Sequence, residues 1–257
     1  LAGERFSRQT AAADPNYTCD IAMLFDVAQA CRRQQLMHSF GLIVTVLQPE
    51  LPSRPQVPRR SRNDTANGVQ PIRAAGQRPP RLMAQITGGK EEYLLRPDLG
   101  RLLTDEAKRT VAERCVKSAN VQVVVGDGLS AAAVEANVRQ MFPVLKQGVQ
   151  AAGLTFGTPF FIQYCRVGVI NDIGEVLKPD VVILLIGERP GLGRAESMSA
   201  YMAYRPKTGD TDADRDVVCN IFENGGTNPL EAGAFAVQIA QRMLKHQASG
   251  VKLKLIK

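Results

Sequence analysis

The residues best suited to ligand chemistry follow an apolar segment in the second half of the chain. Residues 181–186 are all apolar, and the turn Gly187-Glu-Arg-Pro-Gly-Leu-Gly193 comes directly after them. Such a run is typical of a strand covered on both faces of a parallel sheet, and ligands of these sheets bind beyond the carboxyl ends of the strands. Glu188 can accept hydrogen bonds from ligand amides or hydroxyls, or it can pair with Arg189 or Arg194. This turn is the first candidate for a ligand-binding edge.

A second carboxylate occupies the corresponding turn of an earlier unit. Residues 121–125 predict a strand, which Gly126-Asp-Gly-Leu-Ser130 ends, and Ser130 can cap a helix that begins at the next residue. This is the strand–turn–helix half of a βαβ unit. Asp127 can serve a ligand or orient the turn by accepting backbone N–H bonds, and we expect the second role.

Several common site chemistries lack their residues here. A dinucleotide site needs the pattern Gly-x-Gly-x-x-Gly followed by a distant acid. The pairs Gly126-x-Gly128 and Gly191-x-Gly193 lack both the third glycine and that acid, which disfavours a nicotinamide oxidoreductase. The only histidines, His38 and His246, are too few for a His-based metal site or a catalytic triad. Alternating aspartates could bind Ca²⁺, but without the EF-hand glycine and glutamate a solvated acidic loop is favoured. These aspartates are Asp210, Asp212, Asp214 and Asp216.

The elements that position these turns alternate between strands and helices from residue 90 onward. We expect strands over 121–125, 160–167, 181–186 and 197–204, and a short strand or turn entry over 93–95. We expect helices after Thr104 and Ser130, over 143–152 and 172–177, and from Asn228 to Gly250 with Glu231 completing a capping box. The alternation predicts an α/β domain over 90–257 with a doubly wound, mostly parallel sheet.

Residues 1–89 have a different composition and are expected to form an irregular N-terminal segment. They hold 11 arginines, no lysine and six acids, a net charge of +5 out of the chain's +7. A short helix is expected over 20–33, a strand over 41–47 and a linker or disorder over 49–80, where seven of the 15 prolines lie. Because the charge excess lies in this segment and no aromatic-basic repeats accompany it, we expect no nucleic-acid site.

The remaining composition favours a reduced, cytosolic protein. No apolar run approaches the roughly 18 residues that a membrane helix needs, and residues 1–5 lack the pattern of a secretory signal. The cysteines are odd in number, scattered and without zinc spacing, so we expect neither disulfides nor a structural metal. They are Cys19, Cys31, Cys115, Cys165 and Cys219.

Six collinear segments together resemble the small subunit of ethanolamine ammonia-lyase, an adenosylcobalamin enzyme. Each segment alone is weakly specific, but six in order over about 90–250 are specific. They are Tyr93-Leu-Leu-Arg-Pro-Asp-Leu-Gly100, Asp127-Gly-Leu-Ser130, Gly157-Thr-Pro-Phe-Phe161, Asp172-Ile-Gly-Glu175, Gly187-Glu-Arg-Pro-Gly-Leu-Gly193 and Asn224-Gly-Gly-Thr227.

The resemblance implies a lyase subunit, inactive alone, in a hetero-oligomer that converts ethanolamine to acetaldehyde and ammonia. It implies a Rossmann-like domain that closes the cobalamin site against a larger barrel-shaped subunit, which carries the catalytic groups. The cofactor-binding residues carried over are Val167, Glu188 and Val217. The family often has cysteine at the third position, whereas this chain has Cys219 two residues later. The resemblance further implies a cytoplasmic location, which includes bacterial microcompartments, and no nucleic-acid or membrane partner.

Two other observations qualify the resemblance. No Asp-x-His-x-x-Gly motif occurs, so a bound cobalamin should keep its own base on cobalt.

Residues 1–89 lack a clear counterpart in the family, and one hypothesis is that they are translated out of frame. Mass-spectrometric peptides of the native protein that match residues 50–85 would contradict it. A non-catalytic α/β binding or scaffold module is the rival function.

Overall fold

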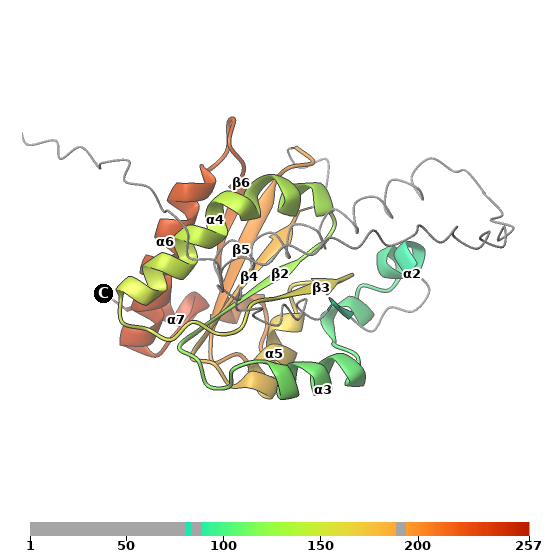
Figure 1. Cartoon of the computed structure of the whole chain (residues 1–257), viewed down its shortest axis with the longest axis horizontal. Coiled ribbons are helices and arrows are strands. Elements are labelled where there is room, and N and C mark those ends of the chain that lie inside the picture. Colours follow the sequence, from blue (N-terminus) through green and yellow to red (C-terminus); the bar gives the residue numbers. More distant parts are fainter. Residues whose placement is uncertain (1–80, 84–88, 189–193, 257) are drawn as a thin grey trace, which may run out of the picture.

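The computed structural model describes residues 81–83, 89–188 and 194–256, which form an open sheet with helices on both faces (Figure 1). Within these ranges no helix is both long and apolar enough to cross a membrane. The strands are β1 (Arg81–Met83), β2 (Val121–Gly126), β3 (Phe160–Gln163), β4 (Val181–Gly187), β5 (Met198–Tyr204) and β6 (Asp216–Ile221). The helices are α2 (Gly89–Leu95), α3 (Asp105–Arg114), α4 (Ala131–Ala151), α5 (Val169–Leu177), α6 (Pro229–His246) and α7 (Gly250–Lys254), with 3-10 turns η1 (Leu99–Arg101) and η2 (Asp212–Asp214).

The six strands lie in the order β1-β3-β2-β4-β5-β6. Neighbours from β1 to β4 are parallel, whereas β5 is antiparallel to both β4 and β6. The predicted α/β class with a mostly parallel sheet centre is confirmed. The sheet has helices on both faces, as a doubly wound fold does, but the Rossmann-like part of the prediction is not confirmed. The link from β4 to β5 is too short for the crossover helix that parallel pairing needs, so β5 runs back along β4.

Two apolar cores lie on opposite faces of the sheet. Helices α4 and α6 cover one core, and α3 and α5 cover the other. Strand β4 contributes to both: alternate residues from Val181 to Leu185 pack into the first core, and those from Val182 to Ile186 into the second. All of these side chains are at most 5% exposed, which explains why the strand shows no polar alternation.

Several predicted elements are wrong in type or length, among them the strand expected over 160–167, which ends at Gln163. Residues 93–95, expected as a strand or turn entry, are the last turn of α2, whose first turn carries Glu91 and Glu92 at the positive end of the helix dipole. The helix expected over 143–152 is the second half of α4, which contains Pro143. The buried neighbours Phe142 and Leu145 pack against the first core on either side of the proline, and this packing offsets the lost backbone hydrogen bond.

The C-terminal region contains two elements that the sequence analysis misses. Asp216 begins β6 rather than ending a loop, and α6 ends at His246, with Gln247 in the left-handed conformation. Gly250 begins α7 instead of ending α6. Its φ is +62°, and an added Cβ would lie 2.1 Å from the carbonyl oxygen of Ala213. Glycine is therefore required where the chain passes the η2 turn.

The three predicted helix caps are confirmed. Thr104, Ser130 and Asn228 each accept a hydrogen bond from a backbone amide in the first turn of their helix. At Asn228 the donor is the Leu230 amide at 2.9 Å. The predicted capping box with Glu231 is absent from the hydrogen bonds of this described helix, so the Asn228 side chain caps it alone.

The elements predicted over 20–33, 41–47 and 49–80 lie outside the described residues. Strand β1 precedes the predicted domain boundary at residue 90 and pairs with β3 in parallel. The sheet therefore takes in part of the segment 1–89.

Candidate functional site

A cavity of about 570 Å³ opens at the sheet edge where β2, β4 and β6 end and β5 begins. Val167 from the β3–α5 loop, Glu188 from the end of β4 and Val217 from β6 all line it. Cys219, the alternative to Val217, lines the same cavity. The fold thus brings together all three residues predicted to bind the cofactor, although they come from three separate segments.

The winding of the chain explains why the cavity lies at this edge. Strand β2 leads into α4 on one face, whereas the neighbouring β3 leads into α5 on the other face. Loops that leave toward opposite faces create a crevice, the usual ligand position in open α/β sheets. Gly128 has a φ of +54°, and a Cβ there would lie 2.4 Å from the carbonyl oxygen of Gly187. The turns after β2 and β4 therefore pack backbone against backbone.

The Glu188 carboxylate is held by three donors. Its Oε2 accepts a hydrogen bond from Ser197 Oγ at 2.6 Å. Its Oε1 accepts one from Ser199 Oγ and another from the Asn220 backbone amide at 3.2 Å. A carboxylate offers about four acceptor positions, so roughly one remains, on Oε2. Glu188 is thus a fixed acceptor with capacity for a ligand N–H or O–H.

The alternative pairing of Glu188 with an arginine is not seen in the described part of the chain. Arg194 is exposed and forms no ion pair with Glu188 there, and Arg189 lies outside the described residues. Ser197 lies directly before β5 and Ser199 within it, and both side chains reach the carboxylate. These serines are not among the residues predicted to form the site; a Ser-x-Ser pair that follows a strand-end carboxylate along the chain is the signal that identifies them.

Val217 and Cys219 form the β6 part of the cavity wall. They lie two residues apart on the strand, and both line the cavity and are exposed. Val217 is 46% exposed, which is unusual for a valine in a sheet and leaves its side chain available to a ligand. The thiol of Cys219 therefore contributes to the same wall as Val217.

Tyr93 and Arg166 form the wall beside the β3–α5 loop, and the sequence analysis singles out neither. Tyr93 is 2% exposed and donates its hydroxyl to the Cys165 carbonyl at 2.9 Å. Burial raises the pKa of the Tyr93 phenol well above its ordinary value. The Arg166 guanidinium lies 4.3 Å from the centre of the Tyr93 ring and donates to the Tyr93 carbonyl at 3.2 Å. Helix α2 is thus fixed to the cavity wall.

Asp127 is fully buried beside the β3–α5 loop. Burial raises the pKa of its carboxyl group to about 7, although the nearby backbone amides of Tyr164, Cys165 and Gly128 act in the opposite direction. None of these amides reaches hydrogen-bond geometry with either carboxylate oxygen. The prediction that Asp127 orients the turn by accepting backbone N–H bonds is therefore wrong, since neither carboxylate oxygen accepts one.

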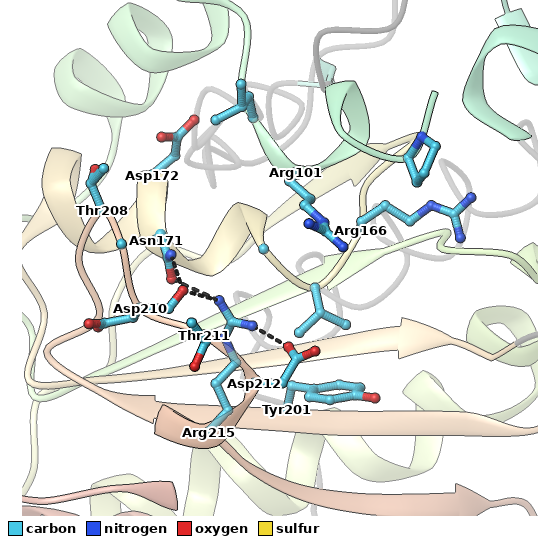
Figure 2. A pocket seen from close by; sticks show the side chains of 15 residues that line it. Arg101, Arg166, Asn171, Asp172, Tyr201, Thr208, Asp210, Thr211, Asp212 and Arg215 are labelled. Atoms are coloured by element: carbon cyan, nitrogen blue, oxygen red, sulfur yellow. Dashed lines mark hydrogen bonds and ion pairs between the residues drawn. The ribbon is translucent and has the colours of Figure 1, made fainter. Parts of the chain in front are cut away.

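A second cavity, of about 490 Å³, adjoins the first and is lined by charged side chains (Figure 2). The Arg215 side chain is only 5% exposed and forms an ion pair with Asp212. It also donates to Asn171 Oδ1 at 3.0 Å and to the Asp210 carbonyl at 3.3 Å. Figure 2 shows this network as dashed lines. No residue of the η2 turn is buried and the Asp212 side chain is 85% exposed, so the predicted solvated loop is confirmed there, although its aspartates also have protein partners.

The other two aspartates of this run also have structural partners. Asp214 accepts from the Thr211 amide at 3.0 Å, and Asp216 accepts from the Gly250 amide at 2.6 Å. Over residues 81–83, 89–188 and 194–256, no three His, Cys, Asp or Glu side chains group as metal ligands. These contacts favour a structural role for the aspartates over Ca²⁺ binding.

The fold and cavity define a class of protein: an α/β domain with a cavity at the carboxyl edge of its central parallel strands. Residues 66–254 match the family described as "Ethanolamine ammonia-lyase light chain (EutC)". The chain belongs to this family, which confirms the resemblance identified from the six segments. The match begins at residue 66. The hypothesis of an out-of-frame N-terminal segment is therefore restricted to the residues before 66.

Named relatives agree with this assignment. The chain is 50% identical to the ethanolamine ammonia-lyase small subunit of Clostridium perfringens over 165 residues, which are 64% of this chain and 56% of that protein. Small subunits of Listeria innocua and Listeria monocytogenes are each 49% identical over the same shares. The chain therefore spans about half the length of the relatives it matches.

Proposed function

We propose that this chain is the small subunit of an adenosylcobalamin-dependent ethanolamine ammonia-lyase, which converts ethanolamine to acetaldehyde and ammonia. It closes the cobalamin site at the interface with a larger, barrel-shaped subunit. The observation that carries the proposal is the convergence of Val167, Glu188 and Val217 on one cavity. The family match and the names of the relatives support the same assignment.

The residues of this cavity fit a corrinoid. A corrin ring presents an apolar face and a rim of amide side chains. Val167 and Val217 offer apolar contact, and Glu188 offers an acceptor for an amide N–H. Because Glu188 is already held by Ser197 and Ser199, it needs little reordering when the ligand binds.

This chain supplies binding and orientation in the proposed enzyme. When bound, adenosylcobalamin supplies a Co–C bond whose homolysis starts radical chemistry. Glu188 accepts hydrogen bonds from two hydroxyls and an amide, and these bonds hold its carboxylate in place as an acceptor for the ligand. The two valines shield their side of the cofactor from water. We place the catalytic groups on the larger subunit and the complex in the cytoplasm, including bacterial microcompartments.

Reconstitution with a large subunit tests the proposal. Acetaldehyde should form from ethanolamine only when both chains and adenosylcobalamin are present. Absence of acetaldehyde with a large subunit that is active beside another small subunit would contradict the proposal. Co-purification of the two chains without any corrinoid binding would instead support the scaffold function.

A further inference from the structure

Two arginines, Arg101 and Arg166, are packed against each other's loops at the boundary between the two cavities. The Arg166 backbone amide donates to the Gly100 carbonyl at 2.7 Å. A Cβ on Gly100 would lie 2.8 Å from Cγ of Arg166, and a Cβ on Gly168 would lie 2.9 Å from Cβ and Cγ of Arg101. Each glycine therefore makes room for the arginine of the other loop, and together they fix where both side chains begin.

Neither guanidinium has a carboxylate partner among the described residues. Arg166 contacts the Tyr93 ring and carbonyl, and its Nε is buried without a hydrogen-bond partner. The Arg101 side chain makes no hydrogen bond or ion pair within the described ranges. Both side chains line the charged cavity, and Figure 2 shows them apart from the network around Arg215.

The carboxylates that line this cavity are each engaged elsewhere. Asp172 pairs with Lys108 at 3.1 Å and accepts from the Leu103 amide. Asp212 pairs with Arg215, and the Asp210 carboxylate accepts from the Lys207 amide at 3.0 Å. The positive charge of the two arginines is therefore not neutralised by these groups.

We propose that Arg101 and Arg166 form a phosphate-binding subsite that takes the phosphodiester of the cobalamin nucleotide loop. Guanidinium groups present planar forks of N–H donors that match phosphate oxygens. Helix α5 begins at Val169, directly after the capping residue Gly168, and directs its positive dipole end toward the same loop. The subsite rests on the proposed function and extends it to a second chemical group of the same cofactor.

One ligand can reach both cavities because they share wall residues. Arg166, Val167 and Tyr201 line both of them. A corrin ring held against Val167 and Glu188 would lie within the first cavity, and a phosphate attached to its rim could reach the arginines of the second. The apolar and the charged cavity are then two parts of one site.

The test compares two corrinoids on the complex of both subunits. Cyanocobalamin carries the nucleotide loop, whereas dicyanocobinamide lacks it and its phosphate. Arg101→Gln, which breaks no hydrogen bond in the described part of the chain, should weaken cyanocobalamin binding about tenfold and leave dicyanocobinamide binding unchanged. Arg166→Lys keeps the charge but loses the fork, and should also weaken only cyanocobalamin. Arg242→Gln, an exposed arginine on α6, is the matched control and should change neither.

The outcomes separate this subsite from the proposed function. An equal loss of affinity for both corrinoids, or no loss for either, would overturn the phosphate subsite but not the proposed function. Weaker association of the two subunits, with both corrinoids affected alike, would show that the arginines bind an acidic group of the partner instead. If the parent complex binds neither corrinoid, the proposed function fails and the subsite fails with it.

Discussion

Two carboxylates at the same edge of the sheet differ in their burial and hydrogen bonding. Asp127 follows Gly126 at the end of β2, and Glu188 follows Gly187 at the end of the neighbouring β4. The Asp127 carboxylate is fully buried and neither of its oxygens has a hydrogen-bond partner, whereas the Glu188 carboxylate borders the cavity and accepts three hydrogen bonds. The same local pattern, a glycine and then an acid after a buried strand, therefore gives two different groups.

The difference comes from what the next segments of the chain supply. After β2 the chain enters α4, and the neighbouring loop offers Asp127 only backbone amides that face it without bonding. After β4 the chain turns back into β5, which brings Ser197 and Ser199 to Glu188. The antiparallel half of the sheet thus builds the polar part of the site, while the parallel half provides the crevice.

Gly187→Ala should have the largest effect, because the two turns touch at this residue. A Cβ there would lie 2.0 Å from the Ser130 carbonyl oxygen and 2.6 Å from that of Asp127. We expect the free energy of unfolding, measured by urea denaturation, to fall by about 3 kcal/mol. Gly153→Ala is the control: its φ is +72° but nothing lies within 4 Å, so only about 1 kcal/mol should be lost. Equal losses at the two positions would show that the turns are not in close contact.

Asp127→Asn should change how stability depends on pH. The pKa of Asp127 is about 7 in the folded state and about 3.9 when unfolded, so between these values the unfolded chain binds fewer protons. Stability of the parent protein should therefore fall as pH rises from about 4 to 7, whereas the variant lacks this contribution. The stability advantage of the variant should grow by about 2 kcal/mol between pH 5 and pH 7, as measured by denaturation at each pH. A pH-independent difference would show that Asp127 is already ionised in the folded protein.

Ser199→Ala should produce a smaller loss, confined to Glu188. It removes one of the donors that hold the carboxylate, and we expect about 1 kcal/mol lower stability and roughly threefold weaker cobalamin binding by the complex. In a Glu188→Gln background the same substitution should cost little further binding, because residues in one network are not additive. Full additivity in this double-mutant cycle would mean that Ser199 acts independently of Glu188.

Local features of the site could be predicted from the sequence. Strand β4 and its turn are contiguous, and the apolar run of Val181 to Ile186 identifies both. The caps Thr104, Ser130 and Asn228 also depend on neighbouring residues only. The positions of Val167, Glu188 and Val217 came from the family resemblance, and the structure places them around one cavity.

Features that depend on distant residues could not be predicted. The donors to Glu188 are 9, 11 and 32 residues away, and they meet it only because β5 and β6 reverse direction. Residues 93–95 pack as a helix because Tyr93 reaches the carbonyl of Cys165, 72 residues further on. Strand β6 has exposed residues at Val217 and Cys219 and polar residues at Asp216 and Asn220, so its pattern resembles a loop. Propensity and periodicity carry no information about such contacts.

The central claim is that Glu188 accepts a hydrogen bond from cobalamin in a site shared between two subunits. Its most direct test is equilibrium binding of adenosylcobalamin to the complex of both chains, followed by the change in the corrinoid absorption spectrum. Glu188→Gln should weaken binding about tenfold, while Glu196→Gln, an exposed acid before β5, should leave it unchanged. Equal affinity of the parent and Glu188→Gln complexes would contradict the claim.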